Sequence, residues 1–424
     1  MLIFFIAFAV LLVIGVPIGL SIGASAVVGC LSLGYPMVVI GQKMVTGIDS
    51  FLLIAVPLFI LAGNLMNAGK ITDRIFNTAE RLVGWIPGGL AHANVVASII
   101  FAGMSGSATA DAGGLGTIEM EAMTSKGYDQ EFSGAVTASS SVIGPIFPPS
   151  IPLVIYGSIA SVSVGKLFLG GVIPGLLMGV ALMVLIGIFA IRRKYERVRF
   201  SLKLLIKEFL HSVLALITPL IILAGFTTGW FTPTEASAIA VFYALLISVL
   251  AYRTMNWKTF KKCLLDSALS SANVLLIIGS STLFSYVMIK EGVSRQIADV
   301  ILSVSSNPAV ILLVINVLLL LLGMVMEPGA ILTLMLPVLL PIVQSCGVNL
   351  VHFGVVMVLN LMIGQVTPPF GVCLFTIADV GKMNLERLSK AVLPFIVPLV
   401  IVLFLCTYIP GLVTWLPTAL MGGV

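Results

Sequence analysis

Two proline-rich stretches interrupt apolar segments of the chain, at Ser139–Leu153 (SSSVIGPIFPPSIPL) and at Asn360–Leu374 (NLMIGQVTPPFGVCL). Proline removes a backbone donor and clashes with the preceding turn, so neither stretch can stay helical. Inside a membrane, freed backbone groups are tolerated only where they line a cavity that is enclosed by protein or filled with water. Unpaired carbonyl groups at one broken end can bind a cation, and the amino end of the other half-helix attracts an anion. The two breaks therefore predict ion-binding sites.

Side chains near the breaks offer further oxygen ligands. Hydroxyl groups in the two stretches belong to Ser139, Ser140, Ser141, Ser150 and Thr367. Two segments that we expect to fold as re-entrant hairpins have at their tips Gly103, Ser105, Ser107, Gly323 and Glu327. Asp111 and Glu327 are ionisable residues at membrane depth, and either could bind a cation or cap a half-helix. Oxygen ligands without a thiolate or an imidazole favour an alkali cation.

Each of these features also has a purely structural interpretation. A serine or threonine inside a helix commonly bonds to a carbonyl group of its own preceding turn, and a Gly-Pro break can be a packing kink. The five cysteines show no metal-ligand spacing, so we expect them to be packing residues. The three histidines lie far apart in sequence without an acidic neighbour, and we expect packing or interfacial roles for them.

The composition is that of a membrane protein. Of the 424 residues, 59% are hydrophobic and 9% are charged, whereas soluble domains have about 25% charged residues. Apolar runs of membrane-spanning length recur along the chain, so we expect an all-α polytopic membrane protein in contact with lipid. The first run, Leu2–Ile14, lacks a basic start and a cleavage site, and we expect it to be retained as a helix. The net charge of +5 does not indicate a nucleic-acid partner, because the basic residues mark topology.

The second half of the chain repeats the plan of the first. Four features recur at a shift of 220 residues: Gly144 with Gly364, Pro148-Pro149 with Pro368-Pro369, Gly103-Met104 with Gly323-Met324, and Pro174 with Pro394. Two interrupted spans at corresponding places in two halves are typical of the binding site of a transporter. We therefore expect two repeats, residues 1–191 and 211–424, joined by a basic linker at 192–210.

Each repeat is expected to have the same order of parts. The first comprises scaffold helices 1–67, an amphipathic arm 68–86, a re-entrant hairpin 88–117, a broken span 132–160 and a closing span 167–191. The second comprises scaffold helices 211–289, an arm 290–303, a hairpin 309–341, a broken span 354–378 and a closing span 391–409. In the first scaffold a helix is expected to run from Pro17 to about Val39, and Glu119–Glu131 is expected to be exposed.

The distribution of basic residues predicts the orientation. When the loop after the third span is placed in the cytoplasm, most of the 22 lysines and arginines fall on the cytoplasmic side. This assignment requires an odd number of crossings in each half, with each hairpin returning to its own side. The two halves then have opposite orientation, and both termini lie outside the cytoplasm.

The interrupted motifs resemble those of a known family. The breaks GPIFPPSIP and GQVTPPFG, the hairpin FAGMSGSATAD and the tip GMVMEPGA look like the large membrane subunit of tripartite ATP-independent periplasmic (TRAP) transporters. The resemblance covers essentially the whole chain. It implies an inverted-repeat, elevator-type carrier in the bacterial inner membrane that uses an inward sodium gradient. It also implies a separate small four-helix membrane subunit, a periplasmic substrate-binding protein, and an organic acid such as a C4-dicarboxylate or a sialic acid as cargo.

In this family, sodium binds where a hairpin tip meets a broken span. The resemblance implies sodium ligands at Gly103, Ser105, Ser107, Gly144 and Phe147 in the first site, and at Gly323, Glu327, Gly364 and Thr367 in the second. Substrate is expected between the two tips. The residues that we assign to it are Ser107, Asp111, Ser141, Ser150, Glu327 and Asn360.

Three other functions fit parts of the sequence. A stand-alone sodium-coupled dicarboxylate or citrate carrier of similar architecture would work without a binding protein. A channel would pass ions far faster than a carrier turns over. A membrane-embedded enzyme is not favoured, because no His, Asp or Glu residues stand at catalytic spacing. A carrier therefore explains the sequence best.

Overall fold

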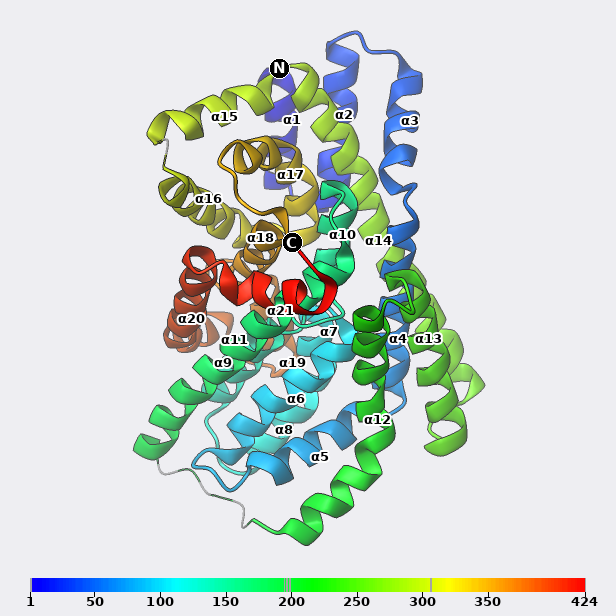
Figure 1. Cartoon of the computed structure of the whole chain (residues 1–424), viewed down its shortest axis with the longest axis vertical. Helices are drawn as coiled ribbons and strands as arrows, with labels where there is room; N and C mark the ends of the chain where they lie inside the picture. The colour runs from blue at the N-terminus through cyan, green and yellow to red at the C-terminus, as the bar shows by residue number, and fades with distance from the viewer. Residues whose placement is uncertain (1, 194, 196, 198–199, 306, 424) are drawn as a thin grey trace.

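The computed structural model of the chain describes residues 2–193, 195, 197, 200–305 and 307–423. Every element in these ranges is a helix, and seven helices within them are long and apolar enough to cross a membrane. Figure 1 shows the N-terminus at one end of the long axis and the C-terminus near middle height. The expected all-α, multi-pass membrane fold is confirmed.

Four helices open the chain: α1 (Leu2–Val13), α2 (Ile18–Ser32), α3 (Met37–Ile48) and α4 (Ala55–Ala68), the last preceded by a short 3-10 turn. The expected helix from Pro17 to about Val39 is wrong. Gly34 adopts a φ of +73° and Pro36 follows it, so α2 ends and α3 starts afresh. A glycine flanked by prolines therefore breaks even a strongly apolar run.

Two amphipathic helices lie at opposite ends of the molecule. Helix α5 (Ile71–Val83) lies at the lower end in Figure 1 and α15 (Val293–Val304) at the upper end. Helix α5 buries Ile71, Ile75 and Phe76 and turns its charged residues outward. Helices therefore occupy both expected arms, and their opposite placement is what an inverted repeat predicts.

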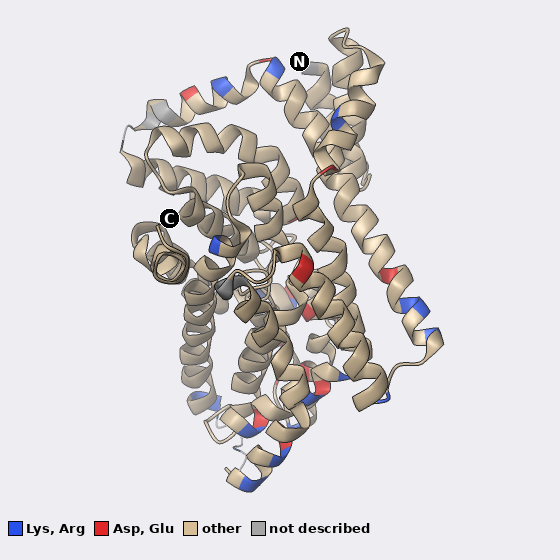
Figure 2. Cartoon of the chain, turned by 45° about the vertical axis from the view of Figure 1, so that its right-hand side comes forward, with Lys and Arg blue, Asp and Glu red and all other residues tan. Residues whose placement is uncertain are grey.

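Charged residues avoid the middle of the molecule. Figure 2 shows Lys, Arg, Asp and Glu gathered toward the two ends, more densely toward the lower end, while the middle is mainly uncharged. A membrane protein needs this distribution, because a charged side chain facing lipid is costly. The apolar zone therefore lies across the long axis of the molecule.

Two helical hairpins reach toward the centre. The first comprises α6 (Gly89–Ser105), α7 (Ala108–Gly113) and α8 (Leu115–Ser125), and the second comprises α16 (Pro308–Gly323) and α17 (Pro328–Ser345). The first hairpin therefore runs beyond residue 117. The expected exposure of Glu119 is wrong, because this residue is 1% exposed and lies on the inward face of α8 with Leu115 and Met123.

Two spans are interrupted as expected. The first consists of α9 (Gln130–Ser141) and α10 (Ile151–Ala160), and the second of α18 (Leu350–Gly364) and α19 (Val372–Val380). The peptide bonds Pro148-Pro149 and Pro368-Pro369 are cis, one in each break. Both breaks therefore fall on the Gly-Pro and Pro-Pro motifs, because proline cannot continue the helix.

The remaining helices complete the bundle: α11 (Val164–Arg193), α12 (Leu202–Thr228), α13 (Pro233–Leu246), α14 (Trp257–Lys290), α20 (Leu385–Tyr408) and α21 (Gly411–Met421). Helix α12 begins inside the expected linker 192–210, and part of that linker lies outside the described residues. Helix α21 was not expected at all. Helix α14 packs against α2, α3 and α4, whereas α11 and α20 pack against the hairpins and broken spans.

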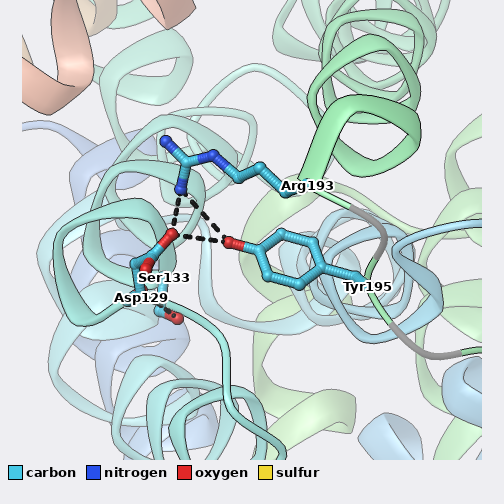
Figure 3. A network of polar contacts seen from close by, with 4 residues as sticks. All are labelled: Asp129, Ser133, Arg193 and Tyr195. Atoms are coloured by element: carbon cyan, nitrogen blue, oxygen red, sulfur yellow. Dashed lines mark hydrogen bonds and ion pairs between the residues drawn. The ribbon is translucent and has the colours of Figure 1, made fainter.

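A polar network joins the end of α11 to the start of α9 (Figure 3). Arg193 donates to the carboxylate of Asp129, and the Tyr195 hydroxyl donates to the same carboxylate at 2.8 Å. The ring of Tyr195 stacks on that of Tyr128 with 4.0 Å between their centroids. Burial, together with the bond to Asp129, raises the pKa of Tyr195, so its hydroxyl stays a donor at neutral pH. The residues that follow α11 are thus fastened to the broken-span side of the molecule.

Candidate functional site

The tip of the first hairpin meets the first break directly. The backbone carbonyl of Gly106, at the tip, accepts a hydrogen bond of 3.4 Å from the N–H of Ile151, the first residue of α10. Gly106 has a φ of +60°, and a Cβ atom there would lie 2.7 Å from the carbonyl oxygen of Pro149. Only glycine fits this close approach without a shift of the backbone.

A buried carboxylate completes this contact. The Ser105 hydroxyl donates a hydrogen bond of 2.5 Å to Oδ1 of Asp111, whose side chain is 1% exposed. Its other oxygen, Oδ2, has no hydrogen-bond partner among the described residues. A Cβ atom on Gly144 would lie 2.7 Å from that oxygen. The structure therefore brings Ser105, Asp111 and Gly144 together and turns one free carboxylate oxygen toward the break.

The second hairpin meets the second break in a similar way. A Cβ atom on Gly364 would lie 2.6 Å from the backbone of Gly323, so the two helices touch at their backbones. The carbonyl of Met324 accepts a hydrogen bond of 3.2 Å from the N–H of Gly371. Gly371 stands 220 residues after Ile151, the shift that relates the two breaks in sequence. The two tip–break contacts therefore correspond.

A cavity of about 740 Å³ lies between the two tips and the helices α2, α4 and α14. Its polar lining comes from both hairpin tips, the second break and the two long helices, namely Asn64, Asn67, Ser105, Ser107, Thr109, Ser270, Asn273, Glu327 and Gln365. Drug-sized ligands occupy pockets of about 300–1,000 Å³. The cavity is therefore large enough for a small organic molecule.

The expected site residues fall into two groups. Ser105, Ser107 and Glu327 line the cavity. The others are not in its lining: Gly103, Asp111, Ser141, Gly144, Phe147, Ser150, Gly323, Asn360, Gly364 and Thr367. Asp111 and Gly144 lie directly behind the lining residue Ser105, as described above.

Several of the second group have other contacts. The hydroxyl groups of Ser141 and Thr367 donate to carbonyl groups of their own helices, Ala138 at 2.9 Å and Ile363 at 2.7 Å, and Ser150 donates within the break to Pro145. The structural interpretation of these hydroxyl groups therefore holds in this conformation.

Three further expected residues lie away from the tip–break contacts. A Cβ atom on Gly103 would meet the ring of Pro219 in α12 at 2.6 Å. The Phe147 ring packs against Gly175 of α11, and Asn360 bonds to Asn316 of α16. These positions are therefore held by packing between helices.

Sequence reasoning missed the amides of the cavity wall. Asn64 and Asn67 of α4, Asn273 of α14 and Gln365 of the second break all line the cavity. Their signal in the sequence was a carboxamide inside an apolar helix, where an unsatisfied polar group is costly. We had considered only ionisable residues at membrane depth, and amides follow the same rule.

The charges of the cavity are one-sided. Among the described residues that line it, Glu327 is the only ionisable side chain, and neither lysine nor arginine contributes. Glu327 is exposed and stands directly before Pro328, the first residue of α17. The remaining polar groups are amides and hydroxyl groups, which can both donate and accept hydrogen bonds. A bound anion would therefore need a positive charge from a source other than a basic side chain.

Comparisons with known proteins agree on one family. Residues 5–412 match the family described as tripartite ATP-independent periplasmic transporter, DctM component. The chain is 45% identical over 382 residues, 90% of each chain, to the sialic acid TRAP transporter large permease protein SiaM of Vibrio cholerae. It is 35% identical over 435 residues to the C4-dicarboxylate TRAP transporter large permease protein DctM of the same organism, covering 97% of this chain and 96% of the relative.

One solved structure has a similar fold. The Alcanivorax borkumensis YdaH transporter matches 88% of each chain with a TM-score of 0.66. The sequence identity is 13%, so this likeness shows the fold alone.

Proposed function

This chain belongs to the DctM component family of tripartite ATP-independent periplasmic transporters, and we propose that it is the large membrane subunit of a sodium-coupled carrier that imports a small organic acid. Sialic acid and C4-dicarboxylates are the proposed cargo, since relatives with these names cover most of the chain. The observation that carries the proposal is the cavity of about 740 Å³ on which both hairpin tips converge.

The charge of the cavity supports coupling to a cation. An organic acid enters as an anion, while the described lining offers one carboxylate, Glu327, and no basic side chain. The free Oδ2 of Asp111 adds a second negative group behind Ser105. Two bound sodium ions, one at each tip–break contact, would offset these charges and bind an anion between them. Sodium at these two places is therefore substrate-like cargo that moves with the acid.

The position of the cavity supports an elevator mechanism. Its lining comes on one side from the hairpins and breaks, and on the other from α2, α4 and α14. Small residues separate the two sides, since a Cβ atom on Gly63 of α4 would lie 3.4 Å from Ser105. Helices that meet through small residues can slide with little steric resistance. The hairpins and broken spans would then move as a transport domain against a scaffold.

Two partners belong to the proposal. A small four-helix membrane subunit would bind the scaffold, and a periplasmic binding protein would deliver the acid. Both are properties of the family that the motifs resemble, and the chain would act in the bacterial inner membrane with both termini in the periplasm. No catalytic step is assigned to the chain.

Reconstitution tests the proposal. Proteoliposomes that contain this chain and its candidate small subunit would be given labelled sialic acid or succinate, with or without an inward sodium gradient and the binding protein. We expect uptake to require all of these components. Uptake without sodium would refute cation coupling, and uptake without the binding protein would identify a stand-alone carrier.

A further inference from the structure

Two buried asparagines occupy corresponding places in the hairpins. Asn94 lies on α6, the first helix of the first hairpin, and Asn316 lies on α16, the first helix of the second. Their exposed fractions are 0% and 4%. Neither residue lines the cavity, so each acts on neighbouring helices rather than on a ligand.

Asn94 fastens the first hairpin to the first broken span. Its Oδ1 accepts a hydrogen bond of 2.6 Å from the Ser140 hydroxyl, and its Nδ2 donates one of 2.8 Å to the Thr137 hydroxyl. Both partners lie on α9 and are at most 1% exposed. The amide therefore spends a donor and an acceptor on one helix.

Asn316 fastens the second hairpin to the second broken span. Its Oδ1 accepts a hydrogen bond of 3.0 Å from Nδ2 of Asn360 on α18, and its backbone carbonyl accepts another of 2.9 Å from the same nitrogen. Its own Nδ2 donates to the Thr407 hydroxyl on α20 at 3.0 Å. The bridge in this half thus ties three helices together.

The two bridges stand at the same distance from the breaks. Ser140 and Asn360 are 220 residues apart, the shift that relates the breaks. Each lies four residues, about one helical turn, before the glycine of its break, Gly144 or Gly364. The side chains differ, but the bridged position is the same in both halves.

A polar bridge at this place sets the position of one helix along another. Apolar helices in a membrane pack without a strong hydrophobic drive, so their packing alone tolerates small axial shifts. A buried hydrogen bond is directional and leaves unsatisfied groups if the helices slide by even part of a turn. Beyond each bridge, the tip and the break must meet through single backbone bonds, Gly106 to Ile151 and Met324 to Gly371.

We propose that Asn94 with Ser140, and Asn316 with Asn360, are positioning residues that hold each hairpin tip at the height where it completes a cation site with its break. This inference rests on the proposed sodium coupling. In it, Asn360 acts through the register of α16 and α18, and its place outside the cavity follows.

Conservative variants test the inference in purified, reconstituted protein. Ser140→Ala removes the hydroxyl that donates to Asn94, and Thr137→Val replaces the second hydroxyl by a methyl group of the same size. We expect each to raise the half-saturating sodium concentration for uptake by about fivefold, the effect of one lost buried hydrogen bond. The maximal rate at saturating sodium should stay near that of the wild type. Asn360→Leu tests the second half in the same way.

Two controls separate register from general loosening. Thr137→Ser keeps the hydroxyl and should restore wild-type sodium dependence. Ser212→Ala removes an equally buried hydroxyl, which accepts from Thr78 of α5 at 2.8 Å and donates to the Arg74 carbonyl at 2.9 Å. It lies far from both breaks in the chain, and we expect no change in half-saturating sodium. The sodium-induced rise in Tm of the purified protein gives a second readout, which does not depend on transport.

The outcomes are distinguishable. Wild-type uptake that ignores sodium would refute the proposed function and this inference with it. Sodium-dependent wild-type uptake with an unchanged sodium requirement in Ser140→Ala, Thr137→Val and Asn360→Leu would overturn the inference alone. An equal shift in Ser212→Ala would overturn it too, because the effect would then be unspecific. If Asn360→Leu fails to fold, the two α9 variants decide.

Discussion

The Ser105 hydroxyl donates a hydrogen bond of 2.5 Å to the carboxylate of Asp111, six residues further along the first hairpin. Two interpretations of Asp111 were open from the sequence, a cation ligand and a cap of a half-helix. The cap of α7 is Ser107, whose hydroxyl accepts from the N–H of Ala110. Asp111 is thus free of that duty, and its Oδ2 faces Gly144 of the break. The geometry therefore favours a role at the tip–break contact.

Replacing Asp111 by asparagine tests this role. Asp111→Asn keeps the size of the side chain and an oxygen for Ser105 but removes the negative charge. We expect uptake at subsaturating sodium to fall by at least about tenfold, because bonds to charged groups are worth more than neutral ones. The measurement is uptake against sodium concentration in proteoliposomes. Glu121→Gln, which removes a charge from the exposed face of α8, is the control and should behave like the wild type.

The carboxylate of Glu327 is expected to matter for sodium rather than for the fold. Glu327→Gln removes the one ionisable side chain in the described cavity lining, and we expect the half-saturating sodium concentration to rise about tenfold. Glu327→Asp keeps the charge on a shorter stem and should lose less. The sodium dependence of uptake measures both variants. Equal behaviour of the two would mean that shape, and not charge, is what Glu327 contributes.

The contact between Gly323 and Gly364 predicts a loss of stability when either gains a side chain. Gly364→Ala would place a Cβ atom 2.6 Å from the backbone of Gly323, and overpacking of this kind costs about 1–3 kcal/mol. Gly41→Ala in α3 is the matched control, since nothing lies within 4 Å of its added methyl group. Chemical unfolding in mixed micelles measures both free energies. A loss as large at Gly41 would contradict the described packing.

Sequence reasoning located the breaks because they depend on local chemistry. Gly-Pro and Pro-Pro cannot continue a helix, so α9 and α18 end where the motifs indicated. It failed where composition was ambiguous. The basic stretch after Arg193 read as a linker, yet Leu202 already begins α12, because basic residues are good helix formers when apolar ones recur beside them.

The site was predicted only in part, for a different reason. Ser105 and Asp111 are six residues apart, so their meeting at a hairpin tip follows from local structure. Asn67 and Asn273 line the same cavity from positions more than 200 residues apart. Only the packing of α4 on α14 brings them together, and one sequence contains no signal for that contact.

The ion pair at the end of α11 is expected to add little stability. Asp129 and Arg193 have side chains that are 57% and 40% exposed, and exposed pairs contribute at most about 1 kcal/mol. Asp129→Asn should therefore lower the free energy of unfolding by no more than this, and the loss should shrink at high ionic strength as the charges are screened. Unfolding at two ionic strengths measures it. A larger, salt-independent loss would assign the effect to the Tyr195 hydrogen bond instead.

The elevator mechanism predicts that a covalent tie between the two sides of the cavity stops transport. A Cβ atom on Gly114, at the bend between α7 and α8, would lie 2.7 Å from the Asn67 amide of α4. In a chain whose native cysteines are replaced by serine, Asn67→Cys with Gly114→Cys should form a disulfide on oxidation. We expect uptake to fall by more than about tenfold when the tie forms, because the transport domain can no longer slide. Reduction should restore uptake.

A tie inside the scaffold provides the control for this experiment. Gly23 of α2 and Ser280 of α14 are equally close, since a Cβ atom on Gly23 would lie 2.8 Å from the Ser280 hydroxyl. Gly23→Cys with Ser280→Cys joins two helices that the elevator mechanism keeps together, so oxidation should leave uptake unchanged. If both ties stopped uptake, the scaffold would itself have to move. If neither did, α4 and the first hairpin would travel as one body, and the boundary between scaffold and transport domain would have to be redrawn on the other side of α4.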